Sequence, residues 1–385
     1  MLIGVAFFWL SVFVLAWVYV GYPGLVLLVA RLRPIRLERA GDWPELVTVG
    51  LAVHNGAAQI AERLANILMQ STPFELEVIV ASDGSEDGTA QAAERSPSAN
   101  ARVVVLDLPR SGQSAAQAAI FADARGQIVV LTDLETRFAP GCLEALVAPL
   151  LDGRMGCSTG VLRWRDDAAT ETARFEGLYW RYEQAVRGWE SRAGWLTAAT
   201  GALLAVRRSL YRPVPAHVSL DQMLPLMARE RGQLVVVADG AAGSDRGPAS
   251  GREQLQSRLR IATQGIESNL RMSLRITPWS QPGAFLAIWS HKLLRWATPY
   301  IAVAAVVDGI YLSASGSSSV YWLPALASGL LVVAAVIGYL AARLGRPVRL
   351  ASFALTVGVV NTAFALAWLN VLARRRVGAW EKRSR

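Results

Sequence analysis

The sequence predicts an α/β domain with a Rossmann-like, mostly parallel sheet, placed between apolar helices at the two ends of the chain. Three observations predict this fold. Short runs of β-branched residues alternate with polar helical segments from residue 44 to residue 250. Two of these runs, VIVASDGSEDGT at 78–89 and VVLTDLET at 129–136, end in carboxylates, as strands of an open α/β sheet do where they deliver ligand groups. Long apolar stretches flank the region.

The composition indicates a soluble domain joined to membrane segments. Of the 385 residues, 53% are hydrophobic and 18% are charged, which is too apolar for a purely soluble protein and too polar for membrane throughout. The net charge of +9 is carried beside apolar stretches, in RLRPIR and in the C-terminal ARRRVGAWEKRSR, so anionic lipid and the positive-inside rule explain it better than nucleic acid. The two cysteines and three histidines give neither a disulfide framework nor a zinc-site pattern.

The first element is a transmembrane helix at residues 1–32. Leu2 to Ala30 is an apolar run without a charged residue, long enough to span the roughly 30 Å hydrocarbon core of a bilayer with some tilt. A signal peptide is the alternative, but the run lacks a basic leading segment and a small-x-small cleavage site. By the positive-inside rule, its end lies in the cytoplasm because it is followed by Arg31, Arg33 and Arg36.

The domain at 44–250 is expected to consist of strand–helix–strand units. The strands LVTVGLAV, LEVIVAS, RVVVLDL and QIVVLTD alternate with the helical segments AQIAERLANILMQ, GTAQAAERS and QSAAQAAIFADA, so right-handed connections build a mainly parallel sheet. After Pro140 we expect a helix in CLEALVAPLL, a strand in MGCSTGVLRW, a long helix in ETARFEGLYWRYEQAVRGWESR, a strand in TGALLAVRR, and a helix then a strand in HVSLDQMLPLMARERGQLVVVADG.

Residues 251–298 are expected to lie at the membrane surface. The run from Arg252 to Arg275 alternates arginine with apolar residues at helical spacing, which is typical of an interfacial amphipathic helix. The next segment, FLAIWSHKLLRW, suits a helix at the headgroup boundary that turns inward at Pro299 and is anchored by Trp289, Lys292, Arg295 and Trp296.

A C-terminal transmembrane region is expected at 299–373, followed by a basic tail at 374–385. The apolar stretches are Phe285–Leu312, Tyr321–Ala342 and Leu350–Ala373. Three full spans would leave the basic tail outside, against the charge rule. We therefore expect two full spans, with Leu350–Ala373 bent or re-entrant at Asn361 so that the tail returns to the cytoplasm.

The acidic strand ends indicate a phosphate-bearing, metal-bound ligand. Asp133 and Glu135 are i, i+2 neighbours, whose side chains share one face of an extended chain and can reach one hard cation. Asp83 ends the other acidic strand, and Asp221 lies well downstream. A nucleotide sugar requires such carboxylates, because a metal stabilises its diphosphate leaving group and a further carboxylate deprotonates an acceptor hydroxyl.

These residues resemble the membrane-embedded, inverting family 2 glycosyltransferases with a GT-A catalytic domain, the group that includes hyaluronan, chitin and poly-N-acetylglucosamine synthases. The resemblance covers nearly the whole chain. AWVYVGYPGLV is similar to the family's opening helix, SDGSEDGT to its DGSxDGT nucleotide turn, and TDLET with FAPGCLEALVAPL to its DxD segment. WRYEQ and TGALLAVRRSLY resemble its acceptor-side region, and SHKLLRW its helix at the membrane boundary.

The resemblance implies a role for each matching residue. Asp221 is implied as the catalytic base, and Asp133 with Glu135 as ligands of Mg²⁺ or Mn²⁺. Contact with the uracil or ribose is implied for Asp83, and further donor contacts for Asn55, Arg110, Arg258 and Arg260. The acceptor side is implied for Thr200, Gly201 and Trp180, and the family's closing W-x-x-R pattern for Trp380 and Arg383.

Several positions depart from the family pattern. Gly56 stands where a glutamate is usual, Gln113 replaces a lysine, Ala118 an asparagine, and Leu259 the tryptophan of QxxRW, while the second DxD carboxylate is Glu135. Loss of the lysine removes a positive charge from the nucleotide site, for which the neighbouring Arg110 is the candidate substitute.

Simpler explanations exist for single residues. Asp83 can cap a helix that starts near Gly88, Asp221 can cap its own helix together with Ser219, and Glu135 can be a solvated loop residue. Arg258 and Arg260 can face anionic lipid. The combination of Asp83, Asp133 and Asp221 favours ligand binding.

We therefore expect a multi-pass protein of the bacterial inner membrane whose cytoplasmic domain transfers a sugar, with inversion, from a UDP-sugar to a growing polysaccharide or a lipid-linked acceptor. Membrane lipids and subunits of a polysaccharide export system are the expected partners, and nucleic acid is not. Two alternatives are open: a catalytically degenerate homologue that serves as a membrane scaffold, and transfer of a single sugar to a polyprenyl phosphate.

Overall fold

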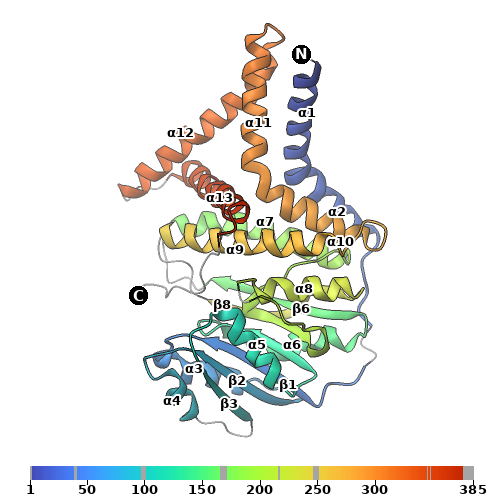
Figure 1. The fold of residues 1–385 in the computed structure, drawn as a ribbon, viewed down its shortest axis with the longest axis vertical. Coiled ribbons are helices and arrows are strands. Elements are labelled where there is room, and N and C mark those ends of the chain that lie inside the picture. The colour runs from blue at the N-terminus through green and yellow to red at the C-terminus, as the bar shows by residue number, and fades with distance from the viewer. Residues whose placement is uncertain are drawn as a thin grey trace.

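The computed structural model describes residues 2–38, 41–96, 101–164, 171–215, 217–245, 251–344, 346 and 348–375, with positions 164, 171–180 and 251–254 described by their backbone. Figure 1 shows a sheet domain flanked by helices and, above it, a group of long helices. Two helices, α7 (Glu171–Arg192) and α9 (Gly251–Ser273), run between these two parts.

One eight-stranded sheet, with the order β3-β2-β1-β4-β7-β6-β8-β5, forms the centre of the domain. The pairs β1–β2, β1–β4, β2–β3 and β6–β8 are parallel, whereas β7 is antiparallel to β4 and β6, and β5 to β8. The predicted α/β fold with a mostly parallel sheet is confirmed. The strands are β1 (Leu46–Val53), β2 (Glu75–Asp83), β3 (Arg102–Leu108), β4 (Ile128–Thr132), β5 (Arg137–Phe138), β6 (Met155–Trp164), β7 (Leu204–Arg207) and β8 (Leu234–Asp245).

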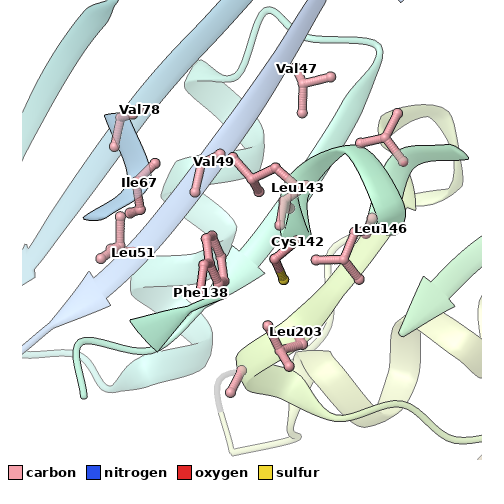
Figure 2. Packing of buried hydrophobic residues seen from close by; sticks show 14 of the residues in the cluster. Val47, Val49, Leu51, Ile67, Val78, Phe138, Cys142, Leu143, Leu146 and Leu203 are labelled. Carbon is pink, nitrogen blue, oxygen red and sulfur yellow. The ribbon is translucent and has the colours of Figure 1, made fainter. Parts of the chain in front are cut away.

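The alternating apolar residues of these strands bury both faces of the sheet. On one face, Val49 and Leu51 of β1 belong to a cluster that includes Ile67 of α3 (Ala57–Leu68) and Leu146 of α6 (Cys142–Val147), as Figure 2 shows. On the other face, a second cluster joins strand residues to α5 (Gln113–Asp123) and α8 (Leu220–Glu230). One further short helix, α4 (Thr89–Glu94), follows β2.

Four helical segments are long and apolar enough to cross a membrane: Leu2–Leu32, Pro282–Ala314, Ser319–Arg343 and Arg349–Leu372. They contain α1 (Leu2–Ala16), α2 (Tyr22–Leu32), α10 (Pro282–Leu286), α11 (Arg295–Ala314), α12 (Leu323–Arg343) and α13 (Arg349–Leu372). In Figure 1, α1 rises beside α11, and α12 leaves Leu326 and Leu330 exposed. This arrangement indicates a membrane protein.

Two of these segments contain a π-helical turn at the level where they meet the sheet domain. η1 (Trp17–Gly21) separates α1 from α2, and η5 (Ala287–Leu294) separates α10 from α11. The two turns contact each other, because Trp17 Nε1 donates a hydrogen bond of 3.0 Å to Ser290 Oγ. π-helical turns are rare and concentrate at functional sites.

The amphipathic helix expected after Arg252 is present as α9, and its apolar face is covered by protein. Ala262 and Ile266 of α9 form a buried cluster with Val360, Phe364 and Ala367 of α13. The apolar stripe that the sequence assigned to the lipid surface therefore packs, at these positions, against a helix from the C-terminal region.

Two expectations about the C-terminal region are wrong. The bend at Asn361 is absent, because α13 runs unbroken from Arg349 to Leu372 and Asn361 Nδ2 donates to the Val357 carbonyl at 2.9 Å within the same helix. The headgroup anchors Lys292 and Arg295 are instead ion-paired to Glu183, and Trp296 is packed against two buried clusters. Their partner Glu183 lies more than a hundred residues away along the chain, so the local sequence pattern does not predict the pairing.

We expect replacement of Glu77 to destabilise the sheet. This carboxylate is buried in β2, where Oε2 accepts hydrogen bonds from Thr48 Oγ1 at 2.7 Å and from the Arg125 N–H at 3.0 Å, while Oε1 pairs with Arg102 at 2.9 Å. Glu77→Leu leaves these donors unsatisfied, so the thermal midpoint of the full chain in detergent should fall by about 5–10 °C. Glu75→Leu, at an exposed position of the same strand, is the control and should change it little. Equal midpoints for the two variants would contradict this account.

Candidate functional site

The carboxyl ends of β1, β2, β4, β6 and β8 lie at the same edge of the sheet. β1, β2 and β4 are mutually parallel, and the two antiparallel steps through β7 give β6 and β8 the direction of β4 again. Asp83 ends β2, Asp133 follows β4 directly, and Asp245 ends β8. The sheet therefore delivers carboxylates from three strands to the same edge, where ligands of open α/β sheets bind.

Asp83 holds the loop that follows β3. Its Oδ1 accepts the N–H of Ser111 at 2.6 Å and that of Gly112 at 3.0 Å, and its Oδ2 lies 3.4 Å from Arg110 Nη1. Gly84 has φ +61°, and a Cβ there would lie 2.7 Å from the Arg110 nitrogen, so glycine permits this close approach. The capping role near Gly88 is wrong for Asp83, which binds the next loop instead.

The SDGSEDGT turn is joined to the end of β1. Asn55 has φ +53°, its N–H donates to Ser85 Oγ at 3.0 Å, and its Oδ1 accepts the N–H of Glu86 at 2.9 Å. The helix after the turn is capped by Asp87, whose Oδ1 accepts the N–H of Thr89 at 3.2 Å. The loops after β1, β2 and β3 are thus connected. They carry three of the residues expected to bind the donor, Asn55, Asp83 and Arg110.

The glycine at position 56 is explained by packing. A Cβ at Gly56 would lie 2.3 Å from Leu134 Cδ2, in the loop that carries Asp133 and Glu135. Leu134 is buried, so it occupies the space that a side chain at position 56 would need. This departure from the family pattern brings the two acidic loops into direct contact.

A buried arginine, Arg63, binds the start of the loop that carries Asp133 and Glu135. Arg63 of α3 is fully buried, and its Nε donates to the Asp133 carbonyl at 3.1 Å, its Nη2 to Thr132 Oγ1 at 2.6 Å. Its guanidinium lies 4.2 Å from the centre of the Phe138 ring. Burial and the nearby Arg137 lower the pKa of Arg63 to about 9. The backbone of Asp133 is therefore fixed by an interaction that does not use its carboxylate.

Four carboxylates interact at the ends of β4 and β8 and the start of α8. Burial, together with the charges of Glu135, Asp245 and Asp221, raises the pKa of Asp133 to about 7, and the Arg260 guanidinium of α9 opposes that shift. The three neighbouring charges disfavour the ionised form of Asp133. Such a group is unfavourable unless a cation joins it, so the site demands more positive charge than Arg260 supplies.

Asp133 and Glu135 fit a divalent cation that a ligand's phosphates help to hold. Across the described ranges, no three His, Cys, Asp or Glu side chains are placed to bind a metal ion by themselves. Mg²⁺ is typically held by one or two carboxylates plus substrate phosphates rather than by an all-protein cage. The two carboxylates, with Asp245 close by, match that donor set.

Asp221 lies against the Thr200–Gly201 turn. It is in the first turn of α8, where Ser219 Oγ donates to its Oδ1. A Cβ at Gly201 would lie 2.3 Å from Asp221 Oδ2, so glycine lets the turn touch the carboxylate. The Thr200 N–H donates to Thr159 Oγ1 of β6 at 2.9 Å. Asp221 makes a helix-start contact with Ser219 and also faces the other carboxylates, so the capping explanation accounts for only part of its position.

The structure brings most of the predicted residues into two adjoining groups. Asn55, Asp83 and Arg110 form the first, and Asp133, Glu135, Asp221, Thr200, Gly201 and Arg260 the second. Arg258 lies two residues before Arg260 on α9 and has a half-buried side chain, so the two arginines point to different faces of the helix. The side chain of Trp180, and both Trp380 and Arg383, lie outside the described residues.

Two contributors to the site were not found from the sequence. Asp245 ends a strand with a carboxylate, as Asp83 does, so the same signal was present in LVVVADGAAGSD, but the strand was taken to end at Gly240. Arg63 stands in a helix with alternating polar residues, and nothing local distinguishes a buried arginine from an exposed one.

Comparison with known proteins connects this fold and site to glycosyl transfer. Residues 48–214 match the family model described as Glycosyl transferase family 2. Two curated relatives are N-acetylglucosaminyltransferases: one from Rhizobium leguminosarum bv. viciae, 25% identical over 57% of this chain and 55% of its own, and one from Mesorhizobium japonicum, 23% identical over 59% and 57%. The chain thus spans just over half the length of these relatives.

A solved structure supports the fold over nearly the whole chain. A mannosyltransferase from Pyrobaculum calidifontis, in complex with GDP-mannose and Mn²⁺, has a TM-score of 0.69 and 22% identity, covering 96% of this chain and 99% of that one. The expected GT-A-like fold is confirmed, and the match to the Glycosyl transferase family 2 model supports the expected relation over residues 48–214.

We expect Asp133→Asn to stabilise the protein in the absence of a divalent cation. The change removes one of the mutually repelling carboxylates while keeping the shape of the side chain, so the thermal midpoint should rise by about 3–6 °C. Mn²⁺ and UDP together should raise the thermal midpoint of the wild type, and the same variant should lose this increase.

The control for this comparison is Asp107→Asn, an exposed aspartate on β3 that should leave both midpoints unchanged. Differential scanning fluorimetry in detergent, with and without Mn²⁺ and UDP, measures both effects. A variant that keeps the full ligand-induced rise would exclude Asp133 as a metal ligand.

Proposed function

We propose that this chain, which contains a family 2 glycosyltransferase domain, transfers a sugar with inversion from a nucleotide diphosphate sugar to a lipid-linked or polysaccharide acceptor at the bacterial inner membrane. The observation that carries the proposal is the position of Asp221, whose charge acts on Asp133 and whose Oδ2 lies beside the Thr200–Gly201 turn. This position supports a base and a cation-binding pair at one site.

The proposed chemistry is a single in-line displacement. Asp221 accepts the proton of the acceptor hydroxyl, whose oxygen forms the new bond to the anomeric carbon as the bond to the diphosphate breaks. A divalent cation held by Asp133 and Glu135 supplies charge neutralisation for the departing diphosphate when bound. Arg260 adds positive charge from α9 on the leaving-group side.

The first acidic turn is assigned to the nucleoside part of the donor. The Asp83 carboxylate is engaged by the 110–112 loop, which makes it the residue that fixes this loop beside the turn. Arg110 stays within 3.4 Å of Asp83 and is 39% exposed, so its charge is available at the rim where the family's lysine is replaced by Gln113. We assign UDP-N-acetylglucosamine as the first donor to test, since the curated relatives are N-acetylglucosaminyltransferases.

A lipid-linked acceptor is favoured over a free polymer because the site lies beneath helices of the membrane part. α9, which carries Arg260, is covered by α13 along its apolar face. The arginines Arg31, Arg33 and Arg36 after the first apolar segment support a cytoplasmic position for the domain. Polymer export with partner subunits, and the scaffold role that Gln113 and Leu259 motivated, are the competing outcomes of the test.

We expect the purified full chain, in detergent or nanodiscs, to release UDP from UDP-N-acetylglucosamine in a Mn²⁺-dependent manner when a polyprenyl phosphate is added. Asp221→Asn should lower the transfer rate by about 10²-fold or more, because general base catalysis contributes that much, while stabilisation by UDP and Mn²⁺ persists. Mass spectrometry of the product separates one added sugar from a polymer. Absence of both UDP release and UDP-induced stabilisation would establish the scaffold role instead, and transfer from GDP-mannose alone would reassign the donor.

We expect Gly201→Ala to impair transfer without impairing donor binding. The new methyl group would lie 2.3 Å from Asp221 Oδ2, so either the turn or the carboxylate must move. A displacement of this size costs about 10²-fold in a positioned reaction. Gly153→Ala, where a Cβ meets nothing within 4 Å, is the matched control. Equal transfer rates in the two variants would count against Asp221 as the base.

A further inference from the structure

A cluster of buried ionised side chains lies where α7 meets the membrane helices. Glu190 accepts a hydrogen bond from Tyr22 Oη at 2.6 Å and lies 2.7 Å from His291 Nδ1. Glu183 lies 2.6 Å from Arg295 Nη1 and 3.4 Å from Lys292 Nζ. Glu190 and Tyr22 are fully buried, so these contacts are shielded from water. Arg295, His291 and Lys292 outweigh the effect of burial and hold the pKa of Glu183 well below its usual range.

Arg187 stands between these two glutamates on the same face of α7. The three positions are spaced i, i+4 and i+7, which places their side chains in a row along a helix. Arg187 is 6% exposed, and burial lowers the pKa of its guanidinium while Glu183 and Glu190 oppose that shift. Glu183 and Glu190, at the two ends of this row, therefore bind residues of the membrane helices, and Arg187 lies between them.

The Arg187 side chain contacts the turn that adjoins Asp221. Arg187 Nη1 donates a hydrogen bond of 3.0 Å to Thr200 Oγ1. The next residue, Gly201, is the one whose Cα lies against the Asp221 carboxylate. Arg187 Nε and Nη2 find no hydrogen-bond partner within the part of the chain that the structure describes, so the guanidinium is held through Nη1 by Thr200.

We propose that Arg187 is a positioning residue that holds the Thr200–Gly201 turn, and through it Asp221, in register with the membrane helices. The proposal rests on Asp221 being the base of the proposed function. Tyr22 is hydrogen-bonded to Glu190, the charge of Glu190 acts on Arg187 one turn earlier on α7, and Arg187 is hydrogen-bonded to Thr200, which adjoins Gly201 and the base. The acceptor side of the site is built correctly when the first membrane segment is docked on α7.

A purely structural role for Arg187 is the competing explanation. The chain offers a comparison in Arg229 of α8, which is 4% exposed and has two guanidinium nitrogens without a hydrogen-bond partner among the described residues. Arg229 lies at the other end of α8 from Asp221. Replacing it removes a buried guanidinium without removing the Arg187–Thr200 hydrogen bond.

We expect Arg187→Met to lower the turnover number for transfer by about 10–100-fold, the loss associated with misplacing a reactive group, with the stabilisation by UDP and Mn²⁺ within about twofold of wild type. Thr200→Val, which keeps the shape and removes the hydroxyl, should reproduce that loss. The double variant should lose no more than Arg187→Met alone, because both changes break one contact. Thr200→Ser, which keeps the hydroxyl, should restore transfer, and Tyr22→Phe should lower it in the same direction.

The measurements are steady-state transfer kinetics and thermal midpoints of the full chain in nanodiscs, with Arg229→Met as control. The inference is overturned if the Arg187 and Thr200 losses add independently, if Arg229→Met lowers turnover equally at the same midpoint, or if donor binding falls in parallel with transfer. Should Arg187→Met fail to fold, Thr200→Val and Thr200→Ser decide the question alone. A wild-type chain that performs no transfer refutes the proposed function, whereas an active wild type with unaffected variants refutes only this inference.

Discussion

Ionised groups at the boundary between the sheet domain and the apolar helices must be paired, and the rest of the structure is arranged around that requirement. Glu190 is fully buried and Glu183 is 14% exposed, so each would be destabilising without a partner. Their partners come from the first and second apolar segments, which fixes how both segments approach α7. The hydrophobic effect explains why these helices leave water, but it is non-directional. The ion pairs specify where they sit on the domain.

The opposite problem exists at the strand ends, where carboxylates are gathered without enough positive charge. The parallel directions of β4 and β8 bring Asp133 and Asp245 to one edge, and α8 adds Asp221. Arg63 holds the acidic loop through backbone and hydroxyl contacts, so the carboxylate of Asp133 is left for a ligand. The fold therefore contains one region in which charges are balanced internally and another that is completed by what binds to it.

The sequence was sufficient for the fold and for the residues that stand at strand ends, because strand periodicity and acidic turns are local signals. Asp83 and Asp133 were found in this way, whereas Asp221, in the first turn of α8, was assigned through the resemblance to the family. Asp245 escaped because its strand continues past Gly240, which becomes clear only when β8 is paired with β5 and β6. Lys292 and Arg295 were assigned to lipid headgroups because their hydropathic surroundings suit that role, whereas their partner Glu183 is distant in sequence. Asn361 was taken as a break, yet its amide is satisfied inside α13. Each error concerns a polar group whose partner is supplied by tertiary structure.

The π-helical turns η1 and η5 determine which face of each membrane helix points toward α7, and hydropathy does not predict this. Each turn accommodates one residue more than an α-helical turn, and one residue corresponds to about 100° of rotation around the axis. Tyr22 follows η1 directly, and Arg295 follows η5 directly, so both side chains reach α7 because of those extra residues. A chain shortened by one residue in either turn keeps its apolar length and its capacity to span a bilayer, but it presents a different face to α7. Residue count within these two turns, rather than apolar character, is what distinguishes a helix that only anchors this domain from one that is aligned with it.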